Sequence, residues 1–290
     1  MTGGRAEGPA GGVAAGAVEE LVGVGVTGVH GIGASVFEVD LDGGGVVVAK
    51  FHAAEGKAGV EAHGLRWLAE PGAVAVPEVR GVDGHWLVID QVEPGAPSAA
   101  AAAELGRGLA RLHAAGAGAF GEGPRESWIG NLPMACVVGQ RWPEWFAEHR
   151  IRPYLRLAVD RRALSPAQAA PVEAVCARIE EVAGPAEPPA RLHGDLWNGN
   201  VLWDRHDRPW LIDPAAHGGH RESDLAMLAL FGCPHLDRVL AAYDEAAPLA
   251  AGWRDRVALH QLFPLLVHVV LFGAGYAGQT AAAARRVLAT

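Results

Sequence analysis

An α+β protein of two lobes is the fold class that the sequence predicts, with a small β-rich lobe followed by a larger, mostly helical lobe. Alternating β-favouring residues and glycine clusters fill the chain up to about residue 93, and helical periodicity dominates from residue 98. A Pro/Gly segment at 94–97, "PGAP", separates the two patterns. We therefore expect a flexible N-terminus over 1–16, an N-terminal lobe over 17–93 and a C-terminal lobe over 94–290.

The N-terminal lobe should contain a sheet and at least one packed helix. "AVEELVG" (17–23) fits a short helix. The stretch 26–52 predicts three strands, because β-favouring residues alternate in it and glycine clusters, including "DGGG", mark the reversals. A helix is predicted over 55–70, where apolar residues share one stripe. The stretch 76–93 predicts a further hairpin that turns at an Asp-Gly pair.

Helices dominate the predicted C-terminal lobe. The first should run from Ser98, a favourable N-cap residue, to Gly116, a favourable helix terminator. Further helices are predicted over 142–160 and 166–183, and the remainder of the lobe beyond residue 213 is also predicted to be helical. Between them, 192–213 predicts a loop, a strand, a turn and a strand.

Composition limits the possible partners and location of the chain. A formal net charge of −9 over 290 residues, without any run of Lys or Arg, argues against binding to nucleic acid or to an anionic membrane. The apolar stretch 262–278 is broken by a proline, a histidine and several glycines, which predicts a buried helix and no membrane span. Three widely spaced cysteines and no signal-peptide pattern favour a reducing cytoplasmic location. The sequence leaves the oligomeric state open.

Five polar residues form the pattern that carries chemistry. "LHGDLWNGNVLW" (192–203) places Asp195 and Asn200 on one loop, and Asp213 ends the apolar strand "WLID". Lys50 lies late in the apolar strand "VVVAKF", and Glu61 follows eleven residues later on the predicted helix. Carboxylate and amide oxygens, together with one paired lysine, are the groups that phosphoryl transfer requires.

Each of these groups has a place in such a reaction. Asp195 would accept the proton of the attacking hydroxyl, and Asn200 with Asp213 would hold Mg²⁺ on the nucleotide phosphates. Lys50, held by Glu61, would bind phosphate oxygens. A glycine turn with Gly31, Gly33 and Ser35 would cover the phosphates with backbone N–H groups.

The loop around Asp195 resembles a known catalytic loop. "HGDLWNGNVL" is similar to the H-x-D-x-x-x-x-N loop of the protein-kinase-like fold, in the H-G-D form of aminoglycoside and choline phosphotransferases, and "LIDPA" stands where kinases have D-F-G. These segments and "WIGNLPMACVVGQRWPEWFAEHRIRPYLRLA" together resemble the fructosamine/ketosamine-3-kinase family over about 24–275. The glycine turn, "GVHGIGAS", departs from the full G-x-G-x-x-G pattern, and Gly64 stands in the middle of the predicted helix.

The resemblance implies a bilobal kinase-like fold and a specific activity. Members phosphorylate the sugar 3-hydroxyl of ketosamines with ATP, and the unstable product then loses its sugar, which deglycates the amine. In this chain the resemblance implies Asp195 as base, Asn200 and Asp213 as Mg²⁺ ligands, and Lys50 as the phosphate-binding cation. It also implies that adenine contacts the backbone between the lobes, at Asp90, Gln91 and Val92.

Several residues near these motifs are candidates for binding the acceptor. Trp197 could stack on the sugar or its amine carrier, or could be a core residue. His217, Arg221 and Glu222 could line the acceptor pocket, with Glu222 paired to a substrate ammonium, although Arg221 and Glu222 could equally form a surface pair. Trp128 could shape the mouth of the pocket.

Two residues are predicted to support the loop without touching substrate. An acid at the place of Asp224 in kinase-like folds holds the catalytic loop through hydrogen bonds to its backbone, and His193 should pack within the loop.

Two other functions stay open at this point. A small-molecule kinase could act on a different hydroxyl, as in an aminoglycoside, choline or homoserine. A catalytically silent nucleotide-binding scaffold is less favoured, because Lys50, Asp195, Asn200 and Asp213 are all intact.

Overall fold

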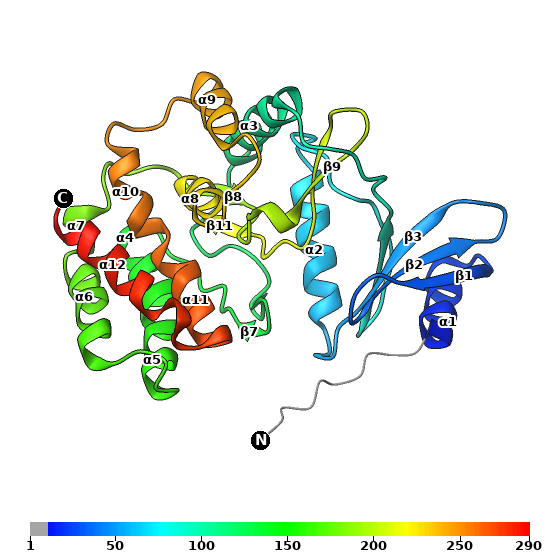
Figure 1. Ribbon diagram of the computed structural model, residues 1–290, viewed down its shortest axis with the longest axis horizontal. Helices are drawn as coiled ribbons and strands as arrows, with labels where there is room; N and C mark the ends of the chain where they lie inside the picture. Colours follow the sequence, from blue (N-terminus) through cyan, green and yellow to red (C-terminus); the bar gives the residue numbers. More distant parts are fainter. Residues whose placement is uncertain (1–10) are drawn as a thin grey trace.

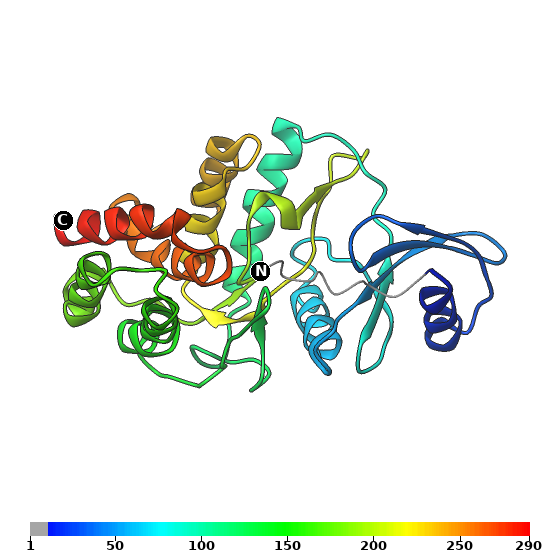
Figure 2. The ribbon, with the colours of Figure 1, turned by 60° about the horizontal axis from the view of Figure 1, so that its bottom comes forward.

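The structure, a computed structural model, describes residues 11–290 and has two parts that face each other (Figure 1). A five-stranded sheet with two helices forms one part, and a mostly helical assembly forms the other, as the sequence predicts. The chain passes from the first part to the second between β5 and α3, and Figures 1 and 2 both show this segment spanning the gap. There the Gly95 N–H donates to Trp203 O at 2.6 Å, which ties the segment to the second part.

The sheet is antiparallel throughout, in the order β1-β2-β3-β5-β4. Its strands are β1 (Val26–Gly31), β2 (Val36–Leu41), β3 (Val46–Phe51), β4 (Val79–Val82) and β5 (Trp86–Asp90). Its strands fall within the stretches where the sequence predicts them. The central strands β3 and β5 have apolar side chains on both faces, because a helix covers either side of the sheet there.

The first helix, α1 (Gly11–Val22), begins earlier than expected. Ala14 and Val18 are buried against Phe37 and Trp86 of the sheet. The expected flexible N-terminus over 1–16 is therefore wrong for residues 11–16, where burial of two small apolar side chains stabilises the helix. The remainder of that expectation falls on residues 1–10, which lie outside the described residues.

The second helix, α2 (Lys57–Ala69), packs on the opposite face of the sheet. Ala58, Ala62 and Leu65 contact Leu87 and Ile89 there. Since side chains alternate along β3, the same face receives Lys50, while its neighbours Val47 and Ala49 face α1. The β3 alternation thus places the ammonium next to α2.

Helices and short hairpins build the second part. The helices are α3 (Ala99–Ala114), α4 (Trp142–Phe146), α5 (Arg152–Asp160), α6 (Pro166–Ala177), α7 (Ile179–Val182), α8 (Glu222–Phe231), α9 (Leu236–Ala246), α10 (Trp253–His260), α11 (Leu262–Phe272) and α12 (Ala277–Leu288). A π-helical turn, Ala147–Ile151, joins α4 to α5, and short 3₁₀ turns lie at Asn198–Asn200 and Ala274–Tyr276. As predicted, Ser98 caps α3 by accepting from the Ala101 N–H at 3.1 Å.

Three two-stranded sheets complete this part and position its loops. They pair β6 (Trp128–Ile129) with β7 (Leu132–Pro133), β8 (Ala190–Leu192) with β11 (His217–Gly219), and β9 (Val201–Trp203) with β10 (Pro209–Leu211). The loop between β8 and β9 carries the HGD motif, and the loop between β10 and β11 carries the LIDPA motif. The two loops contact each other, because the Ile212 N–H donates to Asn200 O at 3.1 Å.

One stretch, Trp253–Phe272, is long and apolar enough to cross a membrane by length and composition. It comprises α10 and α11, and 67% of its 18-residue window is buried inside the protein. Leu262, Leu265 and Leu266 are fully buried and belong to the main core cluster. This stretch is accordingly a core element of the second part, in line with the predicted buried helix.

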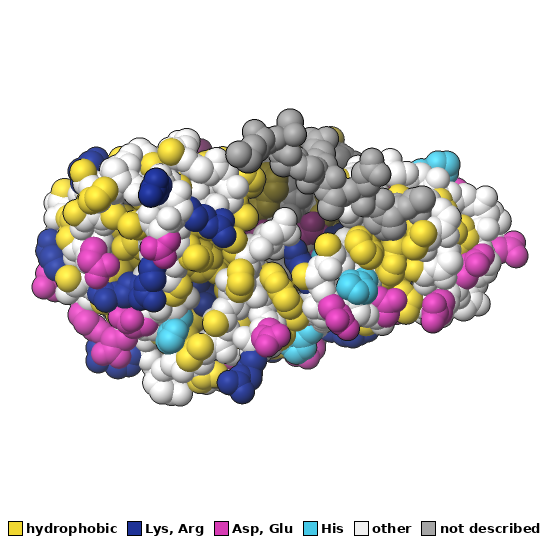
Figure 3. All heavy atoms as spheres, turned by 90° about the horizontal axis from the view of Figure 1, so that it is seen from below, with side chains coloured by type: hydrophobic (Ala, Val, Ile, Leu, Met, Phe, Trp, Pro, Cys, Tyr) yellow, Lys and Arg dark blue, Asp and Glu magenta, His cyan; other side chains and the backbone are white. Residues whose placement is uncertain are grey.

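Surface charge is mixed on the face seen in Figure 3, where acidic and basic side chains alternate with hydrophobic ones. The described residues on this face form no continuous basic patch.

Candidate active site

A cleft between α2 and the two motif loops collects six of the predicted site residues. The residues that line it are His52, Lys57, Val60, Glu61, Trp128, Gly130, Asp195, Trp197, Asn200, Asp213, Pro214 and Ala215. They come from both parts of the molecule, so the cleft exists only because the two parts face each other.

Lys50 reaches across this cleft. Its Nζ donates to Glu61 Oε1 at 2.8 Å and pairs directly with Asp213 Oδ1. Burial alone would raise the pKa of Glu61, but the nearby Lys50 charge and hydrogen bonds from His52 and Lys50 lower it to about 2. Glu61 is therefore ionised and holds the Lys50 ammonium at the cleft, the position that a phosphate-binding lysine needs.

The loop that carries Asp195 is held by buried hydrogen bonds. Asp224 accepts from the His193 N–H at 2.8 Å and from the Gly194 N–H at 3.0 Å. His193 donates from Nε2 to Ile212 O at 2.9 Å, and its Nδ1 accepts the Asp195 N–H at 3.2 Å. These contacts place His193 and Asp224 behind the loop, where both were expected.

Glycine is required at position 194. Its φ is +82°, and a Cβ there would lie 2.1 Å from the Ala215 carbonyl oxygen. The HGD loop and the segment after Asp213 thus approach backbone to backbone. This close approach brings the carboxylates of the two motifs to the same cleft.

Asn200 joins the two motifs. Its Nδ2 donates to Asp195 O at 2.8 Å, to Asp195 Oδ2 at 3.2 Å and to Asp213 O at 3.4 Å. Among the described residues no hydrogen bond engages Asn200 Oδ1, so this oxygen remains available. Together with the half-exposed Asp213 carboxylate it offers the hard oxygen donors that Mg²⁺ prefers. The residues present therefore fit a divalent cation.

Asp195 has the ionisation expected of a general base tuned toward neutral pH. Burial raises the pKa of its carboxyl to about 6, against the opposing hydrogen bond from Asn200. The negative charge of Asp224 acts in the same direction as burial. At pH 7 the carboxylate is mostly ionised and can accept a proton.

The glycine turn joins β1 to β2 next to the end of β3. The N–H groups of Ile32 and Gly33 both donate to Val36 O, at 2.9 and 3.2 Å, and Ser35 O accepts from the Phe51 N–H at 2.9 Å. A Cβ at Gly31 would meet nothing within 4 Å. Position 31 therefore has free space beside it, while the N–H groups of Ile32 and Gly33 are bonded within the turn.

The predicted adenine segment, Asp90, Gln91 and Val92, ends β5 and begins the passage to the second part. Asp90 Oδ1 lies 3.6 Å from Arg80 Nη1, and Gln91 Nε2 donates to Glu38 Oε1 at 2.7 Å. Both side chains are thus bound to partners within the sheet. The predicted contact with adenine would be made by the backbone of this segment, and it stays a prediction.

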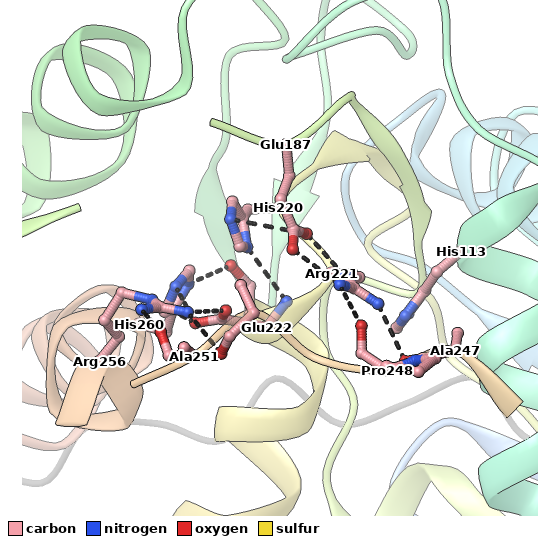
Figure 4. A network of polar contacts seen from close by, with 12 residues as sticks. His113, Glu187, His220, Arg221, Glu222, Ala247, Pro248, Ala251, Arg256 and His260 are labelled. Atoms are coloured by element: carbon pink, nitrogen blue, oxygen red, sulfur yellow. Dashed lines mark hydrogen bonds and ion pairs between the residues drawn. The ribbon is translucent and has the colours of Figure 1, made fainter. Parts of the chain in front are cut away.

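Glu222 and Arg221 do not line the cleft. Arg256 Nη2 and Nε donate to Glu222 at 2.6 and 3.0 Å, and Glu222 is 3% exposed. Figure 4 shows Arg221 pointing toward Glu187 and the carbonyls of Ala247 and Pro248. The expectation that Arg221 and Glu222 line the acceptor pocket is wrong, because each is already paired away from the cleft.

His217 is also absent from the cleft. It is 4% exposed on β11, and its Nδ1–H donates to Ala215 O at 2.8 Å. Burial, with the charge of Arg150, lowers its pKa to about 3, so the ring is neutral. Its expected place in the acceptor pocket is therefore wrong.

A histidine–carboxylate cluster forms behind this segment. One ring nitrogen each of His220 and His260 and one carboxylate oxygen of Glu222 lie within 4.8 Å of one another. Burial alone would raise the pKa of Glu222, but hydrogen bonds from His260 and Arg256 lower it to about 2, so the carboxylate is ionised and paired with Arg256. The cluster is thus a buried ion-pair network and offers no free anionic ligand for a metal.

Two tryptophans do reach the cleft. Trp197 is 41% exposed and Trp128 lies on the β6–β7 hairpin, and both are among the lining residues. Lys57, which the sequence reasoning missed, donates to Gly130 O at 2.7 Å and to Asn131 Oδ1 at 3.2 Å across the cleft. Its position four residues before Glu61 on the same helix face could have indicated it.

The fold and the site together define an ATP-dependent small-molecule kinase with a protein-kinase-like fold. An aminoglycoside phosphotransferase, 18% identical, superposes with a TM-score of 0.64 and covers 95% of this chain and all of its own, which shows the shared fold. The fructosamine kinase family model matches residues 46–290, and the chain belongs to this family.

Individual relatives agree with that assignment. A probable ketoamine kinase of Thermus thermophilus is 39% identical over 220 residues, 75% of this chain and 78% of its own. The chloroplastic protein-ribulosamine 3-kinase of Arabidopsis thaliana is 32% identical, over 74% of this chain and 67% of its own. The crystal structure of a candidate fructosamine-3-kinase from Thermobifida fusca is 48% identical with a TM-score of 0.91, and covers 95% of this chain and 98% of its own.

Proposed function

We propose that this protein transfers the γ-phosphoryl group of ATP to the 3-hydroxyl of a ketosamine. The observation that carries the proposal is the convergence of Lys50, Asp195, Asn200 and Asp213, from both parts of the molecule, at one cleft. The hydroxyl oxygen forms a bond to phosphorus, ADP leaves and Asp195 takes the hydroxyl proton. The membership of the chain in the fructosamine kinase family supports the acceptor.

Asp195 is the residue that we assign to the proton. Its carboxylate lies at the cleft and its backbone is held from behind by His193. Asn200 and Asp213 would hold Mg²⁺ through their side-chain oxygens, and this ion would offset negative charge on the phosphates. Lys50, fixed by Glu61, would bind phosphate oxygens.

The remaining nucleotide contacts follow the same layout. The turn with Gly31, Gly33 and Ser35 would cover the phosphates, and the backbone at 90–92 would receive adenine. The two segments lie toward opposite ends of the strands, because the turn borders Val36, which pairs with Lys50, whereas Asp90 pairs with Val47.

The acceptor would lie between the two tryptophans of the cleft. Trp197 follows Asp195 by two residues and is exposed enough to stack on a sugar face, and Trp128 lines the same cleft. Phosphorylation at the 3-hydroxyl would destabilise the ketosamine and release the sugar, so we assign the protein a role in deglycation in the cytoplasm.

A panel of acceptors with labelled ATP tests the proposal. We expect label on deoxyfructosyl-lysine or ribulosyl-lysine, with the phosphate at the 3-position by NMR, and none on an aminoglycoside, choline or homoserine. Transfer only to an aminoglycoside, to choline or to homoserine would show that the acceptor is that compound and not a ketosamine. Nucleotide binding without transfer to any of them would favour a silent scaffold.

A further inference from the structure

A row of aromatic rings leads away from the cleft over the second part of the molecule. It begins at Trp197, whose ring lies 6.4 Å from Phe231 at the end of α8. Phe231 lies 4.5 Å from His268, and His268 lies 5.3 Å from Phe272 and 5.0 Å from Tyr276. We call these four residues beyond Trp197 the aromatic strip: Phe231, His268, Phe272 and Tyr276.

The strip is continuous with the mouth of the cleft. Gly130 lines the cleft, and a Cβ on it would lie 3.2 Å from Leu271, the residue before Phe272. The β6–β7 hairpin thus lies between α2 and the end of α11, as Figure 1 shows. The strip therefore borders the cleft at two places, beside Trp197 through Phe231 and beside Gly130 through Leu271.

The strip has the properties of a binding surface for an apolar group. Phe272 is 66% exposed, the highest value among the large exposed hydrophobic side chains of residues 11–290. His268 donates from Nδ1 to Pro264 O at 2.8 Å, and burial lowers its pKa, so the ring is neutral near pH 7. Isolated exposed apolar side chains are common, but Phe272 packs in a cluster with three partly buried rings that connect it to Trp197 of the cleft.

We propose that the aromatic strip binds the carrier part of a lysine-linked ketosamine, and that the enzyme prefers an aromatic residue next to the glycated lysine. This inference rests on the proposed function. With the sugar hydroxyl at Asp195 and the sugar beside Trp197, the lysine side chain leads the peptide backbone out over Phe231. A neighbouring aromatic side chain can then stack against Phe272, where offset and edge-to-face pairs are favourable.

Two matched substrates test the preference. We would compare kcat/KM for acetylated deoxyfructosyl-lysyl-phenylalanine amide and for the glycine analogue, which carry the same sugar and lysine. The expected ratio is about threefold to tenfold in favour of phenylalanine, the range that one aromatic pair supplies. Phe272→Ser should bring the ratio close to one, and Phe272→Tyr should keep it.

Val138→Ser serves as the control, because Val138 is 61% exposed and lies outside the strip. It should keep the wild-type ratio. Equal kcat/KM for the two peptides in the wild type, or an unchanged ratio in Phe272→Ser, would overturn the inference while the proposed function stands. If the wild type phosphorylates neither peptide but another acceptor, both the function and the inference are wrong.

Discussion

Protonation of Asp195 should set the pH below which kcat/KM falls. Because burial raises the pKa of this carboxyl to about 6, protonation removes the base as the pH falls through that value. We expect kcat/KM for the acceptor to be level above about pH 7 and to fall roughly tenfold per unit below about pH 6. Rates measured between about pH 4.5 and 8.5 would check this. A limb near pH 4, the ordinary range of an aspartate, would show that the carboxyl is unperturbed.

Asp195→Asn separates catalysis from binding. The amide keeps the size of the side chain but cannot accept the hydroxyl proton, so we expect turnover to fall by about 10²-fold or more. Nucleotide affinity, measured by calorimetry, should change little because the phosphate and metal groups are other residues: Lys50, Asn200 and Asp213. Unchanged turnover would remove Asp195 from the role of base.

The sequence located the residues of the cleft better than those of the acceptor pocket. Asp195 and Asn200 share one short loop, and Asp213 follows an adjacent strand, so local spacing is enough to bring them together. Glu222 lies nine residues after Asp213, but its position depends on Arg256, which is 34 residues away in the chain. A partner so distant leaves no mark on the local pattern, and the sequence therefore misplaced Glu222.

Gly64 explains how α2 comes close to the segment after Asp213. A Cβ on Gly64 would lie 3.1 Å from Pro214 and 3.2 Å from Ala216. The mid-helix glycine costs about 1 kcal/mol relative to alanine in propensity, and it permits this close contact. We expect Gly64→Val to push α2 outward, displace Glu61 from Lys50 and lower kcat/KM for ATP by about tenfold or more.

Gly59→Val is the matched control, since Gly59 lies on the same helix and a Cβ there meets nothing within 4 Å. Both substitutions place a valine on the same helix, so steady-state kinetics of the pair compare a crowded position with an open one. Equal activity of the two variants would show that the contact of α2 with Pro214 does not position Glu61.

The Glu222 network anchors the start of α8 to α10. Its carboxylate is 3% exposed and receives two hydrogen bonds from Arg256 (Figure 4). Glu222→Gln would leave a buried guanidinium without its counter-charge, and we expect the free energy of unfolding to fall by about 3–5 kcal/mol at pH 7. Urea unfolding would measure it. Glu245→Gln, which removes an exposed pair with Arg238, should cost under about 1 kcal/mol.

The pairing of Glu222 with Arg256 makes this stabilisation depend on pH. The pKa of Glu222 is about 2 in the folded protein against an ordinary value of 4.5, so the carboxylate is favoured by folding. Its contribution is complete above about pH 4.5 and is lost as the pH falls toward 2. The difference between wild type and Glu222→Gln should accordingly shrink below about pH 4.5, and a constant difference would contradict the assignment.

Whole elements were predictable where periodicity is strong. The strands of the sheet, α2, and α3 with its Ser98 cap follow from alternation, apolar stripes and capping. The early start of α1 was hidden, since "GGVAAG" has weak helix propensity and is stabilised by tertiary burial of Ala14. The three-residue strands β8 and β11 are too short to give a period, so their pairing was not predictable either.

Polar contacts join the two parts of the molecule inside the cleft and beyond it, and a ligand held by both parts should stabilise the whole chain further. Lys50 pairs with Asp213, and Lys57 bonds to Gly130 O across the same cleft. Nucleotide with Mg²⁺ would add contacts to both parts at once. At about one hundred times its dissociation constant we expect roughly 2.7 kcal/mol of added stability, seen as a higher Tm. EDTA should remove most of this shift, and Asp213→Ala should reduce it similarly, because each takes away the metal bridge between the site and the phosphates. An equal shift with and without EDTA would mean that nucleotide binds without the divalent cation that the proposed reaction needs.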